Sequence, residues 1–351
     1  MGWWQVNADT LAGSRFVVSP LAETFASLKV LHAGTGAHPG EHAWLAAHLP
    51  AYRAELARAP LTALLVRSGL GKEWIADFLT PTPREGEPFA EEIARVRHAD
   101  PAAARAHLTL SLAGPLPAAL HRDDLPARAA DLLTYVWEET VRPYWARRRR
   151  VLEADVLART AQLGQGGWAA VLDAMRPGMR WLGGNRLQVN RHEYPPREIS
   201  GARLVFVPVT PQRVGWVAWE ERERYAVVYP CAGVLADGGE GTVSAALGPL
   251  LGEARARVLV LLDSPMSTTQ LCAVTGQGLG SVGRHLRVLL DAGLVRRGRA
   301  GRSVLYARTA AGEVVVAAGR GRDARPAGES SPAPPLPRPI PGAEPPDPPS
   351  A

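Results

Sequence analysis

The residues best suited to chemistry form a group of arginines near the C-terminus. Between Gly280 and Arg308 the sequence holds seven arginines and a single acidic residue, Asp291. The arginines are Arg284, Arg287, Arg296, Arg297, Arg299, Arg302 and Arg308. This local excess of +6 equals the formal net charge of the whole 351-residue chain, so the other residues sum to zero. Positive charge confined to one short segment indicates a surface that binds a polyanion.

The elements that must position these arginines can be traced along residues 249–316, which predict three helices, a β-hairpin and a short helix. Ser267 and Gln270 have the spacing of a capping box, which begins the second helix. The third helix is expected at about 279–292, with Gly293 in the left-handed position that ends it. One face of this helix is apolar. The opposite face presents Gly280, Ser281, Gly283, Arg284 and Arg287.

Small residues beside arginines are typical of a recognition helix that enters the major groove of double-stranded DNA. We expect Arg284 and Arg287 to contact bases or their surroundings, supported by Ser281. His285 is expected to pack or to contact a phosphate. The hairpin at about 294–308 would form a basic wing, with Arg299 and Arg302 on phosphate or in the minor groove. Two alternatives remain: a helical subdomain with a solvated basic face, and a winged helix that binds protein.

Four segments carry a family resemblance: TQLC (269–272), VGRHLRVL (282–289), AGLV (292–295) and GRSVLY (301–306). They resemble the ArsR/SmtB family of bacterial winged helix-turn-helix repressors. The resemblance implies a cytoplasmic, homodimeric transcriptional repressor that reads two half-sites about one helical turn apart. Three further segments, SPLAE (19–23), DFLTP (77–81) and YPCAGV (229–234), resemble actinobacterial ArsR-like regulators with a long N-terminal domain of unknown role.

No metal or cofactor site is expected. A thiolate metal site needs several converging ligands, whereas Cys231 and Cys272 are the only cysteines and stand far apart in the sequence. We expect Cys272 to be a small buried apolar residue. The chain has no P-loop and no G-x-G-x-x-G after a strand, so nucleotide binding has no support. We also expect no secretion signal and no membrane-spanning segment.

The fold class expected is α+β, in three parts. Residues 15–240 predict a mostly helical N-terminal domain with a small antiparallel sheet, in which an effector or a second copy of the chain could bind. In this part Ser19 would cap a helix, and residues 180–189 would form a hairpin. Residues 246–318 predict the winged helix-turn-helix domain. Residues 319–351 are rich in proline and predict a disordered tail.

The N-terminal domain is the least defined in function. Ten tryptophans against five phenylalanines is an unusual ratio, and Trp137, Tyr144, Trp145 and Trp181 are expected to line a pocket for a flat organic effector. The alternative is ordinary core packing. A different class of function is an enzyme in this domain with an appended regulatory module. We expect no enzyme, because the candidate pairs His42 with Glu41 and Asp123 with Asp124 have no recognisable motif around them.

Overall fold

The computed structural model describes residues 2–37, 39–191, 194–211, 215–220, 222–231, 247–262, 266–300 and 303–323. The helical segments are α1 (Ala8–Ala12), α2 (Pro20–Ala33), α3 (Pro39–Arg58), α4 (Pro60–Gly69), η1 (Asp77–Leu79), α5 (Phe89–Arg97), α6 (Pro101–Leu112), η2 (Ala118–Leu120), α7 (Leu125–Val136), η3 (Trp137–Val141), η4 (Arg142–Tyr144), α8 (Trp145–Asp173), α9 (Leu247–Leu251), α10 (Glu253–Leu261), α11 (Thr268–Thr275), α12 (Leu279–Asp291) and α13 (Ala310–Asp323). The strands are β1 (Trp3–Gln5), β2 (Arg15–Phe16), β3 (Arg180–Gly183), β4 (Arg186–Gln188), β5 (Arg197–Glu198), β6 (Arg203–Val209), β7 (Trp216–Glu220), β8 (Arg224–Pro230), β9 (Met266–Ser267), β10 (Val295–Ala300) and β11 (Ser303–Arg308). No helix in these ranges is long and apolar enough to cross a membrane.

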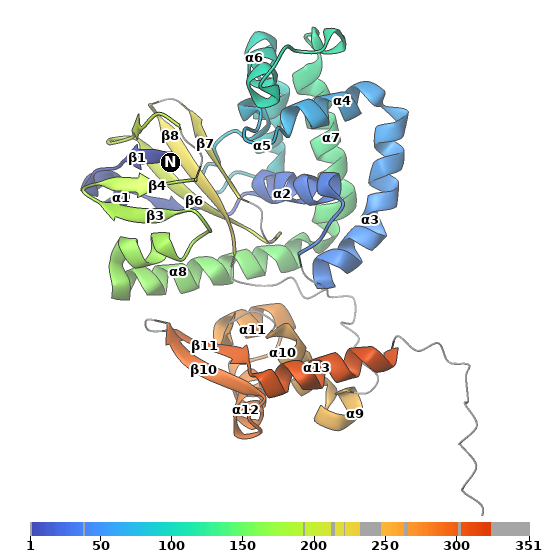
Figure 1. Cartoon of the computed structure of the whole chain (residues 1–351), viewed down its shortest axis with the longest axis vertical. Coiled ribbons are helices and arrows are strands. Elements are labelled where there is room, and N and C mark those ends of the chain that lie inside the picture. The colour runs from blue at the N-terminus through green and yellow to red at the C-terminus, as the bar shows by residue number, and fades with distance from the viewer. Residues whose placement is uncertain are drawn as a thin grey trace, which may run out of the picture.

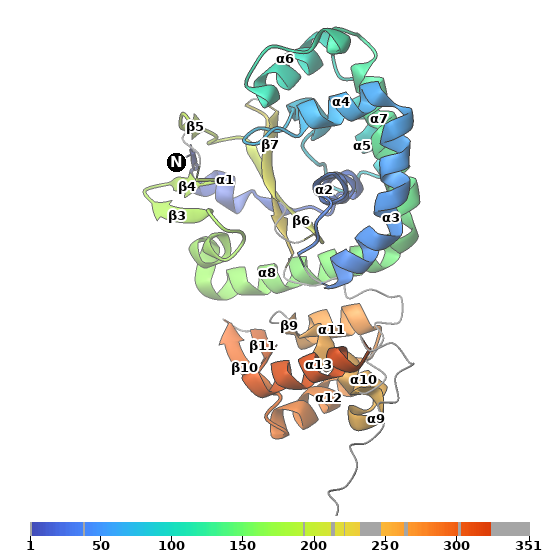
Figure 2. The same ribbon diagram turned by 45° about the vertical axis from the view of Figure 1, so that its right-hand side comes forward.

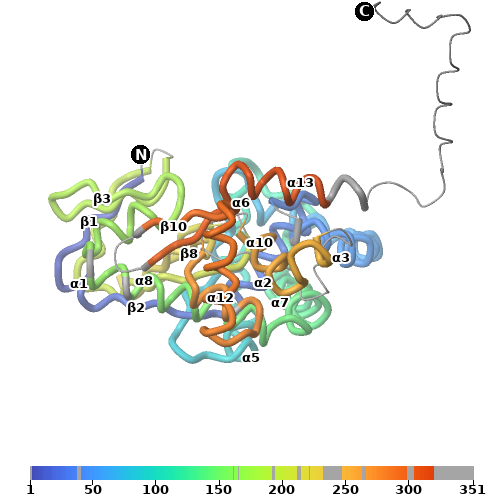
Figure 3. Tube along the Cα trace, turned by 90° about the horizontal axis from the view of Figure 1, so that it is seen from below, coloured from blue at the N-terminus to red at the C-terminus, as the bar shows by residue number. Residues whose placement is uncertain are grey.

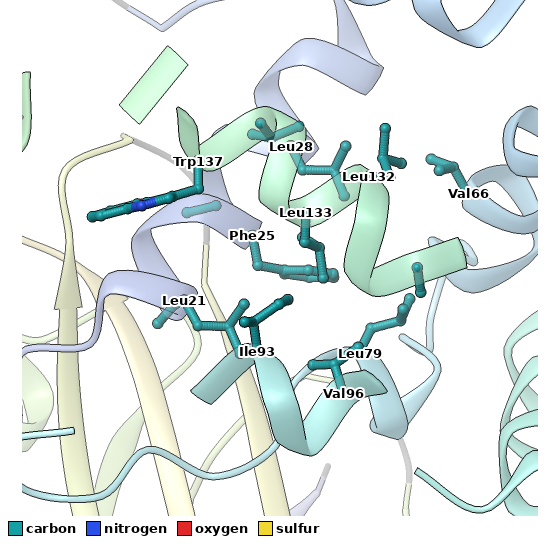
Figure 4. Packing of buried hydrophobic residues seen from close by; sticks show 14 of the residues in the cluster. Leu21, Phe25, Leu28, Val66, Leu79, Ile93, Val96, Leu132, Leu133 and Trp137 are labelled. Carbon is teal, nitrogen blue, oxygen red and sulfur yellow. The ribbon is translucent and has the colours of Figure 1, made fainter. Parts of the chain in front are cut away.

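Helices α3, α5 and α7 pack against α2, most of which is buried, and α4 and α6 pack against α7 (Figures 1 and 2). The predicted cap is confirmed, because the Ser19 hydroxyl accepts a hydrogen bond from the Ala22 amide at 2.9 Å. Phe25 of α2 is fully buried at the centre of the cluster, between Leu133 of α7 and Ile93 of α5 (Figure 4). Burying aromatic and branched apolar side chains from several helices supplies most of the stabilisation of such a bundle.

The expected antiparallel sheet is wrong, because the structure has two mixed four-stranded sheets. Their strand orders are β3-β4-β1-β5 and β2-β6-β8-β7. Strands β6 and β8 pair in parallel, with β8 between β6 and β7. The five inner residues of β8 are all buried, whereas β7 alternates between buried and half-buried positions. A strand buried on both faces favours a central place in the sheet, and the half-buried strand then takes the edge.

The β2-β6-β8-β7 sheet separates two cores. Along β6 the side chains alternate, so Val205 and Val207 face the helices and Leu204 and Phe206 face the other sheet together with the end of α8. The predicted hairpin is confirmed as β3 and β4, which pair antiparallel. Strand β1 pairs with β4 and β5, so the fold begins at Trp3 rather than at the expected residue 15.

The C-terminal unit contains α9 to α13 and a three-stranded sheet in the order β10-β11-β9. It packs against α8, since Val151 and Leu152 of that helix share a buried cluster with Leu271 and Leu286. In Figures 1 and 2, α11 faces α8 and α12 lies on the far side of the unit. Figure 3 views the molecule from that far side.

The C-terminal unit extends further along the chain than the sequence suggested. Helix α13 continues to Asp323, past the expected boundary at residue 318. Gly319 is buried, and a Cβ there would stand 2.7 Å from the Leu247 side chain, so this glycine allows α13 to approach α9 closely. Residues 319–323 therefore belong to a packed helix. The remainder of the expected tail, residues 324–351, lies outside the described residues, as do residues 232–246.

Candidate nucleic-acid interface

Helix α12 is held in place by the helix before it. The capping box is present in both directions: the Gln270 amide donates to the Ser267 hydroxyl at 3.2 Å, and the Ser267 amide donates to Gln270 Oε1 at 2.7 Å. Gly276 then takes a left-handed conformation (φ +72°) and ends α11. Val282, Leu286 and Leu289 anchor α12 in the core. These local features fix which side of α12 faces outward.

The outward side of α12 has the composition that the sequence predicted. Arg284 and Arg287 are exposed and lie one turn apart. Gly280 and Gly283 are also exposed, and a Cβ built at either one would meet nothing within 4 Å. A ligand can therefore approach the backbone of α12 more closely here than at any residue with a side chain. Gly293 has φ +67°, as expected for the residue that follows the helix.

Ser281 and His285 lie together at the edge of this face. The Ser281 hydroxyl donates to Gln277 Oε1 at 3.2 Å and lies 3.3 Å from His285 Nε2. Burial, with the positive charges of Arg255 and Arg284, lowers the pKa of His285 from its ordinary value and so favours the neutral ring in the free protein. Either ring form can hydrogen-bond a phosphate or the Ser281 hydroxyl.

The predicted hairpin is present as β10 and β11, which pair antiparallel from Val295↔Arg308 to Ala300↔Ser303. Arg296 and Arg297 are exposed on β10. Arg302 lies outside the described residues, and the structure describes only the backbone of Arg299. Arg308 has a different role, because its side chain is 5% exposed and donates to Glu313 at 2.9 Å and to the Val260 carbonyl at 3.2 Å.

Leu279 is a feature that the sequence reasoning missed. It is the first residue of α12, and its side chain is 63% exposed. The first residues of a recognition helix are those that reach base edges, and an apolar side chain there can contact a thymine methyl group. The available signal was an apolar residue that directly follows Gly278 and lies off the core face.

The four aromatic residues expected to line an effector pocket divide between two places. Trp137 stacks on Phe89, with ring centroids 4.6 Å apart, and its edge meets Trp145. Tyr144 is 40% exposed and meets the ring of His48, with centroids 5.7 Å apart. Trp181 instead packs in the cluster between the two sheets, with Trp4. An effector site at these four residues stays a prediction.

The two cysteines belong to the same apolar cluster, which joins α8 to the C-terminal unit. Cys231 is buried, and Cys272 is half-buried on α11, where burial raises the pKa of its thiol. Among the described residues, no group of three or more His, Cys, Asp or Glu side chains could hold a metal ion.

The candidate pairs for an enzyme make local structural contacts. Glu41 accepts a hydrogen bond from the Ala37 amide at 2.5 Å, and the ring of His42 lies 3.1 Å from the Gly36 carbonyl. Asp123 pairs with Arg105, and Asp124 pairs with Arg122 and Arg128. Contacts of this kind hold a loop or a helix end in place.

Comparison with known proteins gives a match for one segment of the chain. Neither the search of curated proteins nor the search of solved structures gave a match. Residues 250–298 match a family model described as a helix-turn-helix domain. The matched range covers α10, α11 and α12 and ends in β10. The C-terminal unit therefore contains a helix-turn-helix DNA-binding domain of the kind found in transcriptional regulators.

Proposed function

We propose that this protein is a sequence-specific DNA-binding repressor of the winged helix-turn-helix type, similar to the ArsR/SmtB family. The observation that carries the proposal is the outward face of α12, where two exposed arginines stand beside two exposed glycines. Arginine binds guanine edges and phosphates through its fork of donors, and glycine leaves room for the duplex.

The contacts follow from the order of residues along α12. Leu279 and Ser281 occupy the first turn and meet base edges in the major groove. Arg284 and Arg287 follow, one and two turns further along, and contact bases or flanking phosphates. His285, partly buried beside Ser281, hydrogen-bonds a phosphate or holds the Ser281 hydroxyl in place.

The β10–β11 hairpin acts as the wing. Arg296 and Arg297 already present exposed guanidinium groups on β10. With Arg299 and Arg302 they contact phosphates or the adjacent minor groove, which adds affinity with little dependence on sequence. The protein acts as a homodimer, whose two copies of α12 read half-sites about 34 Å apart.

The test begins with duplexes selected by the full-length protein from a random library and uses gel-shift titrations at several salt concentrations. Replacing Arg284 or Arg287 by Ala should each cost about 1–3 kcal/mol at the selected site. The matched control is Arg58→Ala combined with Arg142→Ala, two exposed arginines remote from α12, which should leave affinity unchanged. Enrichment of no duplex, or equal binding by wild type and the Arg284/Arg287 double variant, contradicts the proposal.

A further inference from the structure

A cavity of about 610 Å³ lies in the N-terminal part of the molecule, far along the chain from the arginine group. Its walls come from β1, from α2, from residues 71–77, from residues 194–197 and from β7. A volume of several hundred cubic ångströms is that of a site for a small organic ligand. None of the four aromatic residues predicted from the sequence lines it.

The wall made by residues 71–77 is fixed before any ligand arrives. The Ser111 hydroxyl accepts a hydrogen bond from the Gly71 amide at 3.0 Å and donates one to the Trp74 carbonyl at 2.8 Å. A Cβ at Gly71 would stand 1.9 Å from the Ser111 carbonyl oxygen, so only glycine allows this approach. A cavity with a preformed wall loses little conformational entropy on binding.

The lining is rich in aromatic rings. The edge of Trp74 meets both Trp219 and Tyr194, with centroid separations of 5.3 and 5.2 Å. Trp216 is held from the other side by Phe25 of the helical core, at 5.2 Å. Rigid rings set at steep angles to one another form the walls of a slot suited to a flat, ring-containing ligand.

Positively charged side chains outnumber negatively charged ones in the lining. Five cations, Lys29, Lys72, Arg176, Arg191 and Arg197, stand against two carboxylates, Glu73 and Asp77. Lys29 and Lys72 are the only lysines of the chain, whose other 38 basic residues are arginines. Both lysines therefore line the same cavity, in a protein that uses arginine everywhere else.

Two of the arginines are already engaged. Arg176 donates to the carbonyls of Val189 and Val228 at 3.0 and 3.4 Å, and Arg197 lies over the ring of Trp219 at 4.1 Å. The ammonium group of Lys29 differs from them. Within the described ranges it has no hydrogen-bond or ion-pair partner, and its one recorded contact is the face of Trp216, 5.6 Å from the ring centroid.

This isolation of Lys29 has an energetic consequence. Burial, with the charge of Arg176, lowers the pKa of Lys29 to about 8. A partly desolvated ammonium group without a counterion is unfavourable, and an anion beside it would restore the missing pair. A second polar atom also lacks a partner among the described residues: the buried side-chain oxygen of Asn190 accepts no hydrogen bond from them, so it can accept one from a ligand donor.

We propose that this cavity binds a flat organic carboxylate, whose ring system lies among Trp74, Trp216 and Trp219 and whose carboxylate pairs with Lys29. A hydroxyl or amino group on the same ligand donates to Asn190. The two groups define the ligand class as an aromatic or conjugated acid that carries a hydrogen-bond donor. This site needs no DNA, so its test is independent of the proposed function.

The test uses isothermal titration calorimetry on the full-length protein with two matched probes. Hydroxynaphthoate has fused rings, a carboxylate and a hydroxyl donor, and hydroxynaphthamide keeps the rings and the donor without the charge. The wild type should bind the carboxylate at least about tenfold more tightly than the amide, as expected for a charge-assisted hydrogen bond. Equal affinity for the two probes, or binding of neither, overturns the proposal.

Variants then assign the preference to Lys29. Lys29→Met should remove the preference for the carboxylate, and Lys29→Arg should retain it. Arg58→Met removes an exposed charge on α3 and serves as the control that leaves both affinities unchanged. A Lys29→Met protein that folds and still prefers the carboxylate refutes the assignment. If that variant does not fold, the wild-type comparison of the two probes still decides the outcome.

Discussion

Arg148 on α8 donates a hydrogen bond to Glu23 on α2 over 2.7 Å, and the two side chains are 4% and 0% exposed. Arg148 also donates to Ser27 at 2.8 Å, while Glu23 accepts from the Thr210 amide at 2.7 Å. This buried pair joins three parts of the molecule: α2, the end of β6 and α8. Glu23 is on the same helix as Lys29, which lines the cavity, and Arg148 is on the same helix as Leu152, which packs against the helix-turn-helix unit. The pair therefore links the two helices that carry these regions.

Breaking this pair should be costly. Arg148→Met leaves the Glu23 carboxylate buried without its counterion, and we expect a loss of about 3–5 kcal/mol in the free energy of unfolding. Urea titration followed by tryptophan fluorescence measures it. Glu55→Gln, which breaks the exposed Glu55–Arg58 pair, is the control and should change stability by less than about 1 kcal/mol. Similar effects in the two variants would contradict the structural role of the buried pair.

A substitution at Gly283 should change stability and DNA binding in opposite directions. It lies inside α12 with open space around it, so Gly283→Ala should raise the stability of the unit by about 0.5–1 kcal/mol. The added methyl group stands on the face proposed to enter the groove and should weaken DNA binding. Thermal unfolding and gel-shift titration of the same preparation measure both effects. If affinity for DNA stays unchanged, the duplex does not approach the backbone at this point.

The proposed ligand site should depend on pH in two steps. Burial raises the pKa of Asp77 to about 6, against the lowering effects of Arg197 and Trp74, and the pKa of Lys29 is about 8. As pH rises through 6, Asp77 gains a negative charge, and as pH rises through 8, Lys29 loses its positive charge. Both changes weaken binding of an anion, so affinity for hydroxynaphthoate should be greatest just below pH 6, where its carboxylate is still ionised, and should fall twice as the pH rises.

Variants identify each step. Asp77→Asn should abolish the lower step and Lys29→Arg the upper one, in calorimetric titrations repeated across this range. The other charged groups of the lining are Lys72, Glu73, Arg176, Arg191 and Arg197. A pH profile that neither variant changes would contradict the assignment of both steps.

The shared core between α8 and the helix-turn-helix unit predicts one cooperative transition. All ten tryptophans precede residue 220, and of these only Trp145 is packed against the shared core, so their fluorescence reports mainly on the N-terminal part. Hydrogen exchange of the α12 peptide reports on the other unit. Both signals should be lost at the same urea concentration. Leu152→Ala removes a buried side chain from the shared core and should lower the free energy of unfolding obtained from either signal by about 2–5 kcal/mol. Two separate midpoints in the wild type would show that the units unfold independently.

The C-terminal unit was the most predictable part of the fold, because its signals are local. The Ser267–Gln270 box, Gly293 and the apolar face of α12 act within a few residues, and each was found where the sequence placed it. Strands β10 and β11 follow directly after the helix, so their pairing with each other needs no long-range information.

The sheets and the cavity were not predictable in the same way. The order β2-β6-β8-β7 depends on competition between strands for the buried central place, which their spacing along the chain does not reveal. The cavity joins Trp3, Lys29, Trp74, Arg197 and Trp219, which are far apart in sequence. The number of tryptophans suggested an aromatic pocket, but only the fold shows which rings line one. The two lysines were a usable signal, since both stand out against 38 arginines.

The contact between α8 and α11 also constrains protein engineering. A DNA-reading unit joined to its neighbour by a tether alone can be exchanged for another reader as an independent cassette. Here Val151 and Leu152 enter the same apolar cluster as Leu271 and Leu286, so a transplanted reader would leave these two side chains uncovered. A working chimera would have to graft the α8-facing surface of α11 onto the incoming domain as well as the new recognition helix.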